Sequence, residues 1–438
     1  MASRVLIGVG AGFAGDRTDA AGPVVDALAS AQGPRFLMFE TLAERTLALS
    51  QLARRQDPKG GFSPALVRFL APVLARCREH KIKIVGNFGA ANPRAAAERI
   101  LKLSRELGLT VPRIAVVEGD DLTGVLSPSE FSAREIDGNI LRGVTDIIAA
   151  NLYLGAAPIA QALDQDADIV VTGRVADSAL ALGPLMHAFG WRADSWDLLA
   201  AGTLAGHLLE CGAQVTGGYF ADPGFKNVPR MADIGYPIAE ISSGGEIVIT
   251  KPPGTGGRVD RLTVTEQLLY EIHDPSAYLA PDVVLDLTGV TIEEAGPDRV
   301  RISGATGSPR RKLSRPPFAS TAASSAKRKF LMPGRMPLPA PGLRQKQFTS
   351  AWAGVRRSLR SASMQSARSA FLVISMARCG VNGMKAHPIL GSALRRNHRT
   401  PPTWKCCSTR SRRFTAPAPP AVRECAAEPR LGLLAHHA

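Results

Sequence analysis

Long apolar runs and cysteines are scarce in this sequence, and both absences restrict what the protein can be. No uninterrupted apolar segment approaches the roughly 18 residues that a membrane span requires. Only Cys77 and Cys211 precede residue 306, and two isolated thiols in so long a stretch favour a reducing compartment. The first apolar run is interrupted by Gly12, Gly15 and Asp16, which is not typical of a signal peptide. We therefore expect a cytoplasmic protein without a membrane partner.

Acidic residues are nearly absent from the last third of the chain. Residues 307–438 contain 25 Lys and Arg but 2 Asp and Glu, a net charge of +23, whereas residues 1–306 carry −8. The overall net charge of +15 ordinarily suggests a nucleic-acid partner, but it arises from this segment alone. We therefore expect no specific nucleic acid. The segment is rich in Arg, Ser, Pro and Ala without helix or strand periodicity, which predicts a disordered basic tail.

Apolar strand-like runs alternate with helical ones before residue 306. The strand-like runs are residues 4–8, 36–40, 82–86, 113–117 and 168–171, and the helical patterns include residues 64–80, 147–162 and 201–210. Strands that alternate with helices at this spacing form βαβ units. The pattern predicts an α/β fold with a mainly parallel, doubly wound sheet and helices on both faces. It predicts one domain over residues 1–306, with a candidate subdivision near residues 190–220, followed by the tail at 307–438.

The stretch 168–182 is the strongest candidate for the centre of a ligand site. Its strand ends near Thr172, before a helical run, and ligands of open α/β sheets bind at the carboxyl ends of strands. We expect Arg174 and Asp177 on that rim. Arg174 would bind a carboxylate or polarise a thioester oxygen, with Asp177 holding it in place. The alternative is a buried ion pair with a structural role.

A glycine-rich segment follows the first strand. Gly10, Gly12 and Gly15 have the G-x-G-x-x-G spacing that lets backbone amides approach a phosphate. Asp16 argues against a dinucleotide because it places negative charge beside the expected pyrophosphate, although Arg17 can offset that charge. Two interpretations stay open. The glycines form a tight turn between strand and helix, or Gly12, Asp16 and Arg17 belong to a loop that binds an anion or substrate.

Polar side chains also follow the next two predicted parallel strands. Asn87 and Asn92 come after the run 82–86 and offer amide groups to a substrate, although Asn92 precedes a proline and is equally typical of a helix start. Asp120 is one of three carboxylates in the segment 118–121, which follows the run 113–117. Such carboxylates act as acid and base or bind a metal, and solvated turn residues are the alternative.

His207, Glu210 and Cys211 lie close together on or just after a predicted helix. His-x-x-Glu with a cysteine can form a metal site, but the sequence has no second His-x-x-Glu and no Cys-x-x-Cys. A polar-lined pocket is therefore favoured, and we predict no metal and no cofactor. Lys251 begins a glycine-rich loop without the spacing of a P-loop, and we count it as a substrate-binding candidate.

These candidates predict one active cleft at the carboxyl ends of the strands. Catalytic roles are expected for Asp120, Arg174, Asp177 and His207. The cleft should gather these four with Asp16, Arg17, Asn87 and Asn92.

Several motifs resemble those of the acyclic terpene utilisation (AtuA) family. They are GFAGDR at 12–17, TGRVAD at 172–177, the stretch 196–222, KPPGTGG at 251–257 and EQLLYEIHDP at 266–275. The resemblance covers nearly all of residues 4–306. It implies a bacterial catabolic protein linked to geranyl- or citronellyl-type acyl-CoA degradation, or to a related branched acyl-CoA route.

Two functions fit this resemblance. The first is a lyase or hydratase for a branched acyl-CoA, in which a carboxylate or His207 moves a proton and Arg174 stabilises an enolate-like oxygen. The second is a non-catalytic partner subunit of an acyl-CoA carboxylase complex, in which the polar loops form contact surface. We expect a CoA thioester as the small-molecule substrate, and a homo-oligomer.

The resemblance stops near residue 309, and a shifted reading frame is a second hypothesis for the tail. When each codon is re-read from its third base, residues 329–342 can become IPYAGPDAAARARA, and residues 403–425 can become VEVLLDEVEALYGTGPAGGAGVR. Both recovered segments resemble the family's C-terminal part. The hypothesis predicts a frameshifted C-terminus that impairs the chain.

Overall fold

The computed structural model describes residues 2–123, 125–133, 147–272 and 274–310, together with two short strands at 372–375 and 430–431. All of these belong to one compact unit, and a second unit, Arg378–Ala427, lies outside the described residues. Most of the basic tail, and with it the prediction that the tail is disordered, also lies outside them.

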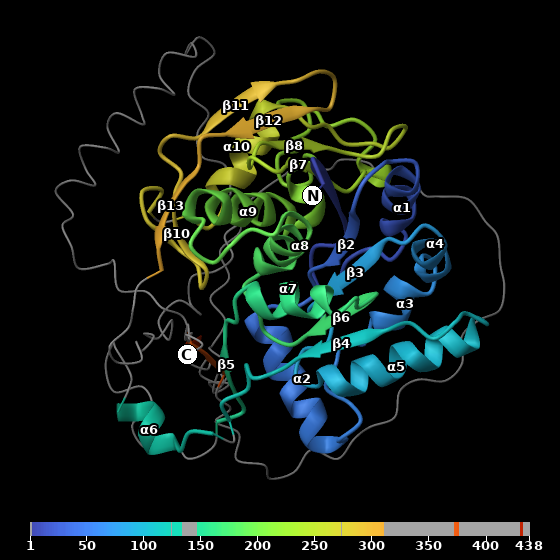
Figure 1. Ribbon diagram of the computed structural model, residues 1–438, viewed down its shortest axis with the longest axis vertical. Helices are drawn as coiled ribbons and strands as arrows, with labels where there is room; N and C mark the ends of the chain where they lie inside the picture. Colours follow the sequence, from blue (N-terminus) through green and yellow to red (C-terminus); the bar gives the residue numbers. More distant parts are fainter. Residues whose placement is uncertain are drawn as a thin grey trace, which may run out of the picture. The chain divides into compact units, whose positions relative to one another are not determined.

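A sheet of nine strands runs through the described unit (Figure 1), in the order β11-β12-β8-β7-β1-β2-β3-β6-β4. Five neighbouring strands pair in parallel: β1 (Arg4–Ala11), β2 (Arg35–Phe39), β3 (Lys83–Gly86), β6 (Ile169–Thr172) and β4 (Ile114–Val117). The predicted α/β fold with its parallel sheet is confirmed, because these are the five strand-like runs of the sequence. The residues of β1, β2, β3 and β6 are almost continuously buried, as expected for strands covered on both faces. The edge strand β4 is only partly buried.

The remaining strands of the sheet pair in antiparallel fashion, and the sequence analysis does not predict them. They are β7 (Ile238–Ser242), β8 (Ile247–Thr250), β11 (Thr291–Glu294) and β12 (Val300–Ser303). A separate three-stranded sheet contains β9 (Tyr278–Leu279), β10 (Val283–Asp286) and β13 (Thr306–Pro309). Because β13 pairs with β10, the described fold continues past residue 306.

Helices cover both faces of the parallel strands, as predicted (Figure 1). One layer contains α1 (Ala21–Ala29), α3 (Leu66–Leu70), α4 (Leu74–Glu79) and α5 (Pro93–Glu106); the other contains α7 (Ala157–Asp164), α8 (Ala179–Phe189) and α9 (Trp196–Leu209). The helices α2 (Glu44–Gln56), α6 (Pro128–Ala133) and α10 (Arg261–Leu269) complete the set in the described residues. The predicted helix 64–80 is two short helices, because Pro72 lies between them and cannot donate a backbone hydrogen bond.

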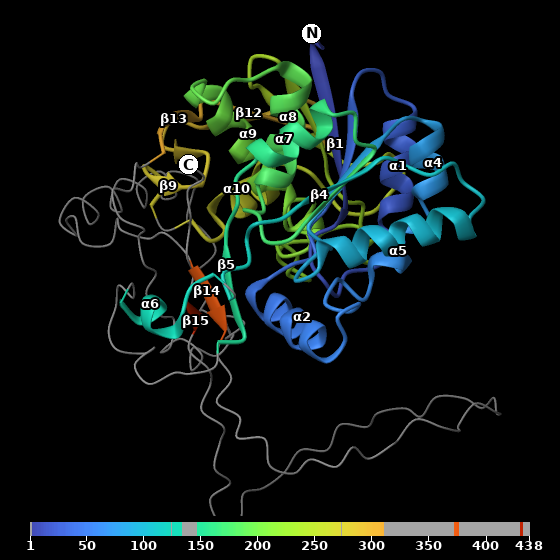
Figure 2. The same cartoon turned by 60° about the horizontal axis from the view of Figure 1, so that its bottom comes forward.

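The prediction of one helix over residues 147–162 is wrong. Residues Ala149–Leu152 form the strand β5, and α7 begins only at Ala157. The backbone of β5 bonds the segment after β4, where Leu152 donates to the Asp120 carbonyl over 2.7 Å. It also pairs with β14 (Leu372–Ser375), which in turn pairs with β15 (Arg430–Leu431). Figure 2 shows β5 and β14 beside α2. This pairing outweighs a short apolar run that fits either structure.

The order of the parallel strands fixes where a site can form. The chain passes from β3 through α5 to β4, and then returns through α7 to place β6 between β3 and β4. Because α5 and α8 lie on opposite faces, the loops that leave β3 and β6 diverge at their carboxyl ends. This is the topological switch point at which α/β sheets bind ligands.

Candidate functional site

Asn87 lies at the switch point but is engaged by its own protein. It follows β3 and is fully buried. Its amide oxygen accepts the Thr41 backbone N–H over 2.7 Å, and its amide nitrogen donates to Glu40 over 2.9 Å. Burial raises the pKa of Glu40 well above its ordinary value, and the charge of Asp177 adds to the effect. Asn87 therefore orders the segment after β2.

Arg174 lies beneath the rim, not on it. The side chain is 1% exposed, and its guanidinium donates to the Leu42 carbonyl over 2.7 Å and to the Val175 carbonyl over 2.6 and 2.9 Å. It also pairs with Asp177 and stacks on the Tyr153 ring, 4.5 Å from the ring centre. Four of its five N–H groups thus have partners inside the protein. Arg174 therefore links the segments that follow β2 and β6.

Asp177 is the member of that ion pair that can gain or lose a proton near neutral pH. Burial raises its pKa to about 7; the charges of Glu210 and Glu44 add to this, and Arg174 opposes it. Its side chain keeps 32% of its surface exposed. A carboxyl that titrates near neutral pH can both accept and donate a proton under physiological conditions.

Asp120 is the second carboxyl held by Arg174. It follows β4 and is 4% exposed, and its Oδ2 accepts the Arg174 backbone N–H over 2.9 Å and the Asn151 amide over 2.8 Å. Burial raises its pKa to about 6, although both hydrogen bonds oppose the shift. The two carboxyls therefore lie on either side of one arginine, and both are shifted towards neutral pH.

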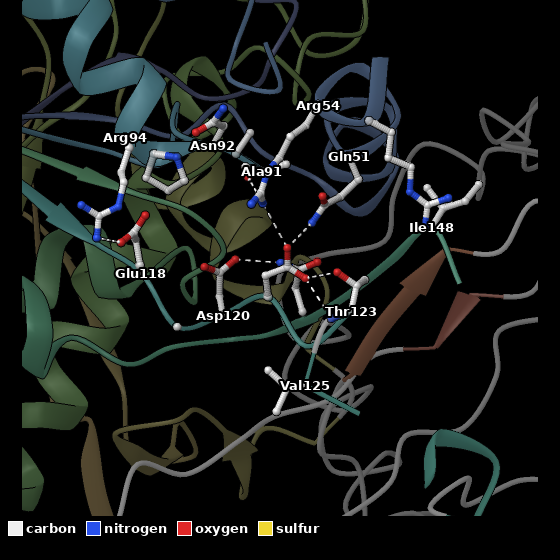
Figure 3. A pocket seen from close by; sticks show the side chains of 16 residues that line it. Gln51, Arg54, Ala91, Asn92, Arg94, Glu118, Asp120, Thr123, Val125 and Ile148 are labelled. Carbon is white, nitrogen blue, oxygen red and sulfur yellow. Dashed lines mark hydrogen bonds and ion pairs between the residues drawn. The ribbon is translucent and has the colours of Figure 1, made fainter. Parts of the chain in front are cut away.

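A cavity of about 670 Å³ opens beside Asp120 (Figure 3). This volume is within the range of small-molecule sites. Figure 3 shows Arg94 facing Glu118, with which it forms an ion pair of 2.6 Å. Gln51 and Arg54 donate to the carboxylate of Asp121 over 2.9 and 3.2 Å. The cavity is lined by residues of α2, of the loop before α5, of the segment after β4 and of β5: Gln51, Arg54, Arg55, Ala90, Ala91, Asn92, Pro93, Arg94, Glu118, Gly119, Asp120, Asp121, Thr123, Val125, Ile148 and Asn151.

Asn92 lines this cavity but has a structural role that accounts for its side chain. Its oxygen accepts the Ala95 N–H at the start of α5, and its nitrogen donates to the carbonyls of Pro58 and Gly60 over 2.9 and 2.8 Å. It is the N-cap of α5, with Pro93 in the first turn. The helix start and the loop before α3 therefore account for the hydrogen bonds of its side chain.

His207 belongs to a neighbouring buried cluster with Glu210. Its Nδ1 lies 3.1 Å from Glu210 Oε1, and its Nε2 lies 3.3 Å from the Leu268 carbonyl oxygen. Burial alone lowers the pKa of His207, but the hydrogen bond and charge of Glu210 outweigh it and raise the pKa. Since both ring nitrogens face acceptors, the imidazolium form is favoured. Burial also raises the pKa of Cys211, so this thiol is not an activated nucleophile.

The glycine segment packs against the residues that follow His207. A Cβ added to Gly12 would lie 2.5 Å from the Cys211 carbonyl carbon, so only glycine fits there. Asp16 accepts the Gly12 N–H over 2.8 Å and the Tyr236 hydroxyl, while Arg17 pairs with Asp19. The Gly12 backbone N–H thus donates to Asp16 and is not available to a bound anion. This arrangement favours the tight-turn interpretation.

Lys251 lies apart from these groups. It lines a separate cavity of about 430 Å³ with Arg4, Glu240 and Arg299. Its Nζ pairs with Asp298 over 3.1 Å and donates to the Thr255 carbonyl over 3.0 Å.

A comparison with known protein families shows to which family the chain belongs. The family described as acyclic terpene utilisation family protein AtuA matches residues 5–382. The chain belongs to the AtuA family. The match extends beyond residue 306, where the resemblance recognised in the sequence ends. No curated protein and no solved structure matches the chain.

The described residues of this AtuA chain contain neither a membrane-spanning helix nor a clustered metal site. In the described ranges, no helix combines the length and apolar character needed to cross a bilayer. The same residues contain no group of three or more His, Cys, Asp or Glu side chains arranged to hold a metal ion.

Glu40, Asn151 and Tyr153 are polar residues of the AtuA site that the sequence analysis does not select. Glu40 follows β2 directly, so the strand-end rule that identifies Asn87 could also have identified it. Asn151 and Tyr153 lie within residues 147–162, for which the sequence wrongly predicts a helix. Tyr153 donates its hydroxyl to Glu44 over 2.6 Å, which ties the end of β5 to the start of α2.

Proposed function

We propose that this protein acts on branched or isoprenoid acyl-CoA thioesters as a lyase or hydratase, in the cytoplasm. The family name supports a role in acyclic terpene utilisation. The cavity beside Asp120 supports a small-molecule substrate, because it is large, concave and lined by both charged and apolar groups.

The observation that carries the proposal is the Asp120 carboxyl at the wall of this cavity. It is buried, it is oriented by two hydrogen bonds, and its pKa is raised to about 6. Lyases and hydratases must move a proton near a carbonyl group, and such a carboxyl suits that task at neutral pH. Asp177, which pairs with the Arg174 guanidinium, would supply a second proton site.

Arg174 acts in this proposal as a positioning residue. Its backbone N–H orients Asp120 and its guanidinium holds Asp177, so it sets the geometry of both carboxyls without touching substrate. Arg54 and Arg94 at the cavity pair with Asp121 and Glu118, and they would bind the phosphates of CoA by exchanging these partners.

The proposal is tested by incubating the purified full chain with geranyl-CoA-derived intermediates and following them by mass spectrometry. We expect turnover that falls by 10²-fold or more, as an order of magnitude, in Asp120→Asn, because the proton-transfer group is lost. Asp166→Asn is the matched control, since Asp166 is exposed and forms surface ion pairs with Lys83 and Arg113. Unchanged turnover in Asp120→Asn would contradict the assignment.

A non-catalytic partner subunit of an acyl-CoA carboxylase complex is the second candidate. It is favoured by exposed large side chains near the loop after β1 and in the segment 219–231: Phe13, Tyr219, Phe225 and Met231. Exposed apolar groups of this kind are typical of protein interfaces. Co-purification with a carboxylase, together with the absence of turnover, would support it. A homo-oligomer would use the same surface.

A further inference from the structure

Among the residues that the structure describes, the amide oxygen of Asn151 has no hydrogen-bond partner. Asn151 lies in β5, is fully buried and lines the cavity beside Asp120. Its Nδ2 donates to Asp120 Oδ2 over 2.8 Å, the orientation that suits an ionised Asp120. Among the described residues that line the cavity, Asn151 alone has a buried side-chain polar atom without a partner. Buried acceptors are rarely left unpaired, because the lost hydration is costly.

Asn151 and Asp120 together present a distinctive surface to a ligand. The free amide oxygen can only accept a hydrogen bond, so it needs a donor such as a hydroxyl group. Asp120 lies directly beside it and can exchange a proton. Arg54 and Arg94 of the same cavity pair with Asp121 and Glu118. The group that complements the amide oxygen is therefore a hydroxyl, and an anionic group of the ligand would have to displace one of these carboxylates.

We propose that Asn151 Oδ1 accepts a hydrogen bond from a substrate hydroxyl, so that the cavity selects hydroxylated acyl thioesters over their deoxy counterparts. This inference rests on the proposed function, because it takes the CoA thioester as the ligand. Asn151 then acts as a specificity-determining residue, since a deoxy substrate would leave its oxygen buried and unpaired.

The test compares two branched thioesters that differ by one hydroxyl group. The dissociation constants of 3-hydroxy-3-methylbutyryl-CoA and 3-methylbutyryl-CoA are measured with the full chain by titration calorimetry. We expect the hydroxylated ligand to bind about tenfold more tightly, as one buried hydrogen bond allows. In Asn151→Leu this ratio should fall to about one. Asn227→Leu, the same change at an exposed residue, should keep the ratio of the unchanged protein.

The possible outcomes separate this inference from the proposed function. Equal binding of both thioesters overturns the role of Asn151 and leaves an acyl-CoA function in place; it would mean that water satisfies the oxygen. Failure to bind either thioester overturns both. If Asn151→Leu does not fold, the ratio in the unchanged protein still decides.

Discussion

Replacing Arg174 tests whether one buried guanidinium holds the carboxyl ends of the strands together. Arg174→Met keeps the length and apolar stem of the side chain but removes its hydrogen bonds to the Leu42 and Val175 carbonyls. It also leaves Asp177 without its cation. The substitution should therefore affect stability directly, whether or not Arg174 takes part in a reaction.

Removing one partner of a buried ion pair typically costs about 3–5 kcal/mol. We expect the lower part of that range for Arg174→Met, because Asp177 keeps 32% of its surface exposed and water can partly replace the arginine. The pKa of Asp177 should rise further without Arg174. The loss of stability should then be greatest above pH 7 and smaller in acid, where protonation neutralises Asp177 in both proteins.

Urea unfolding at pH 5 and pH 8 measures both effects. The double variant Arg174→Met/Asp177→Asn should recover part of the lost stability at pH 8, because it no longer buries an unpaired charge. Arg192→Met is the matched control: Arg192 pairs with Asp194 at the surface, and its loss should change little. A loss below about 1 kcal/mol at both pH values, or one independent of pH, would refute the structural role assigned to Arg174.

Three further predictions concern other parts of the chain. Burial raises the pKa of Asp120 to about 6, so the folded state binds this proton more tightly than the unfolded state does. The free energy of unfolding therefore falls as the pH rises from about 4 to about 6. Asp120→Asn should remove up to about 3 kcal/mol of that fall, measured by urea unfolding at about pH 4 and about pH 6. Gly12→Ala should lower thermal stability by about 1–3 kcal/mol because its Cβ meets the Cys211 backbone. Gly244→Ala is the control, because its Cβ would meet only the Ser242 hydroxyl oxygen at an ordinary contact distance of 3.8 Å. Resequencing across codons 308–313 should reveal a frame change, and an unbroken frame there would refute that hypothesis.

The parallel half of the fold could be predicted because its strands are buried on both faces. Runs such as Ile169–Thr172 are continuously apolar and are bounded by polar or glycine residues, so each is recognisable without its partners. The antiparallel strands are short and only half-buried; Ile247–Thr250 is an example. Their pairing depends on segments distant in sequence, which local periodicity does not report. The strand β5 was missed for the same reason.

The candidate site could be predicted only in part, because position at a strand end does not reveal what a side chain bonds. The strand-end rule correctly placed Asn87, Asp120 and Arg174 at the carboxyl ends of β3, β4 and β6. It could not show that Asn87 and Arg174 are occupied by neighbouring backbone groups, while Asp120 lines an open cavity. That distinction depends on the loops of β2 and β5, which come from other parts of the chain.

The pKa values of Asp120 and Asp177 should be coupled, because both carboxyls interact with Arg174. The backbone N–H of Arg174 donates to Asp120. Its guanidinium pairs with Asp177, which lies three residues later in the chain. A shift of the guanidinium would move the Arg174 backbone and therefore change the hydrogen bond that holds down the pKa of Asp120. Arg174→Lys would retain the positive charge, but a single ammonium group cannot reach the Leu42 and Val175 carbonyls together as the planar guanidinium does. The geometry of the fork, more than its charge, therefore links the stability of these strand ends to the proton chemistry beside the cavity.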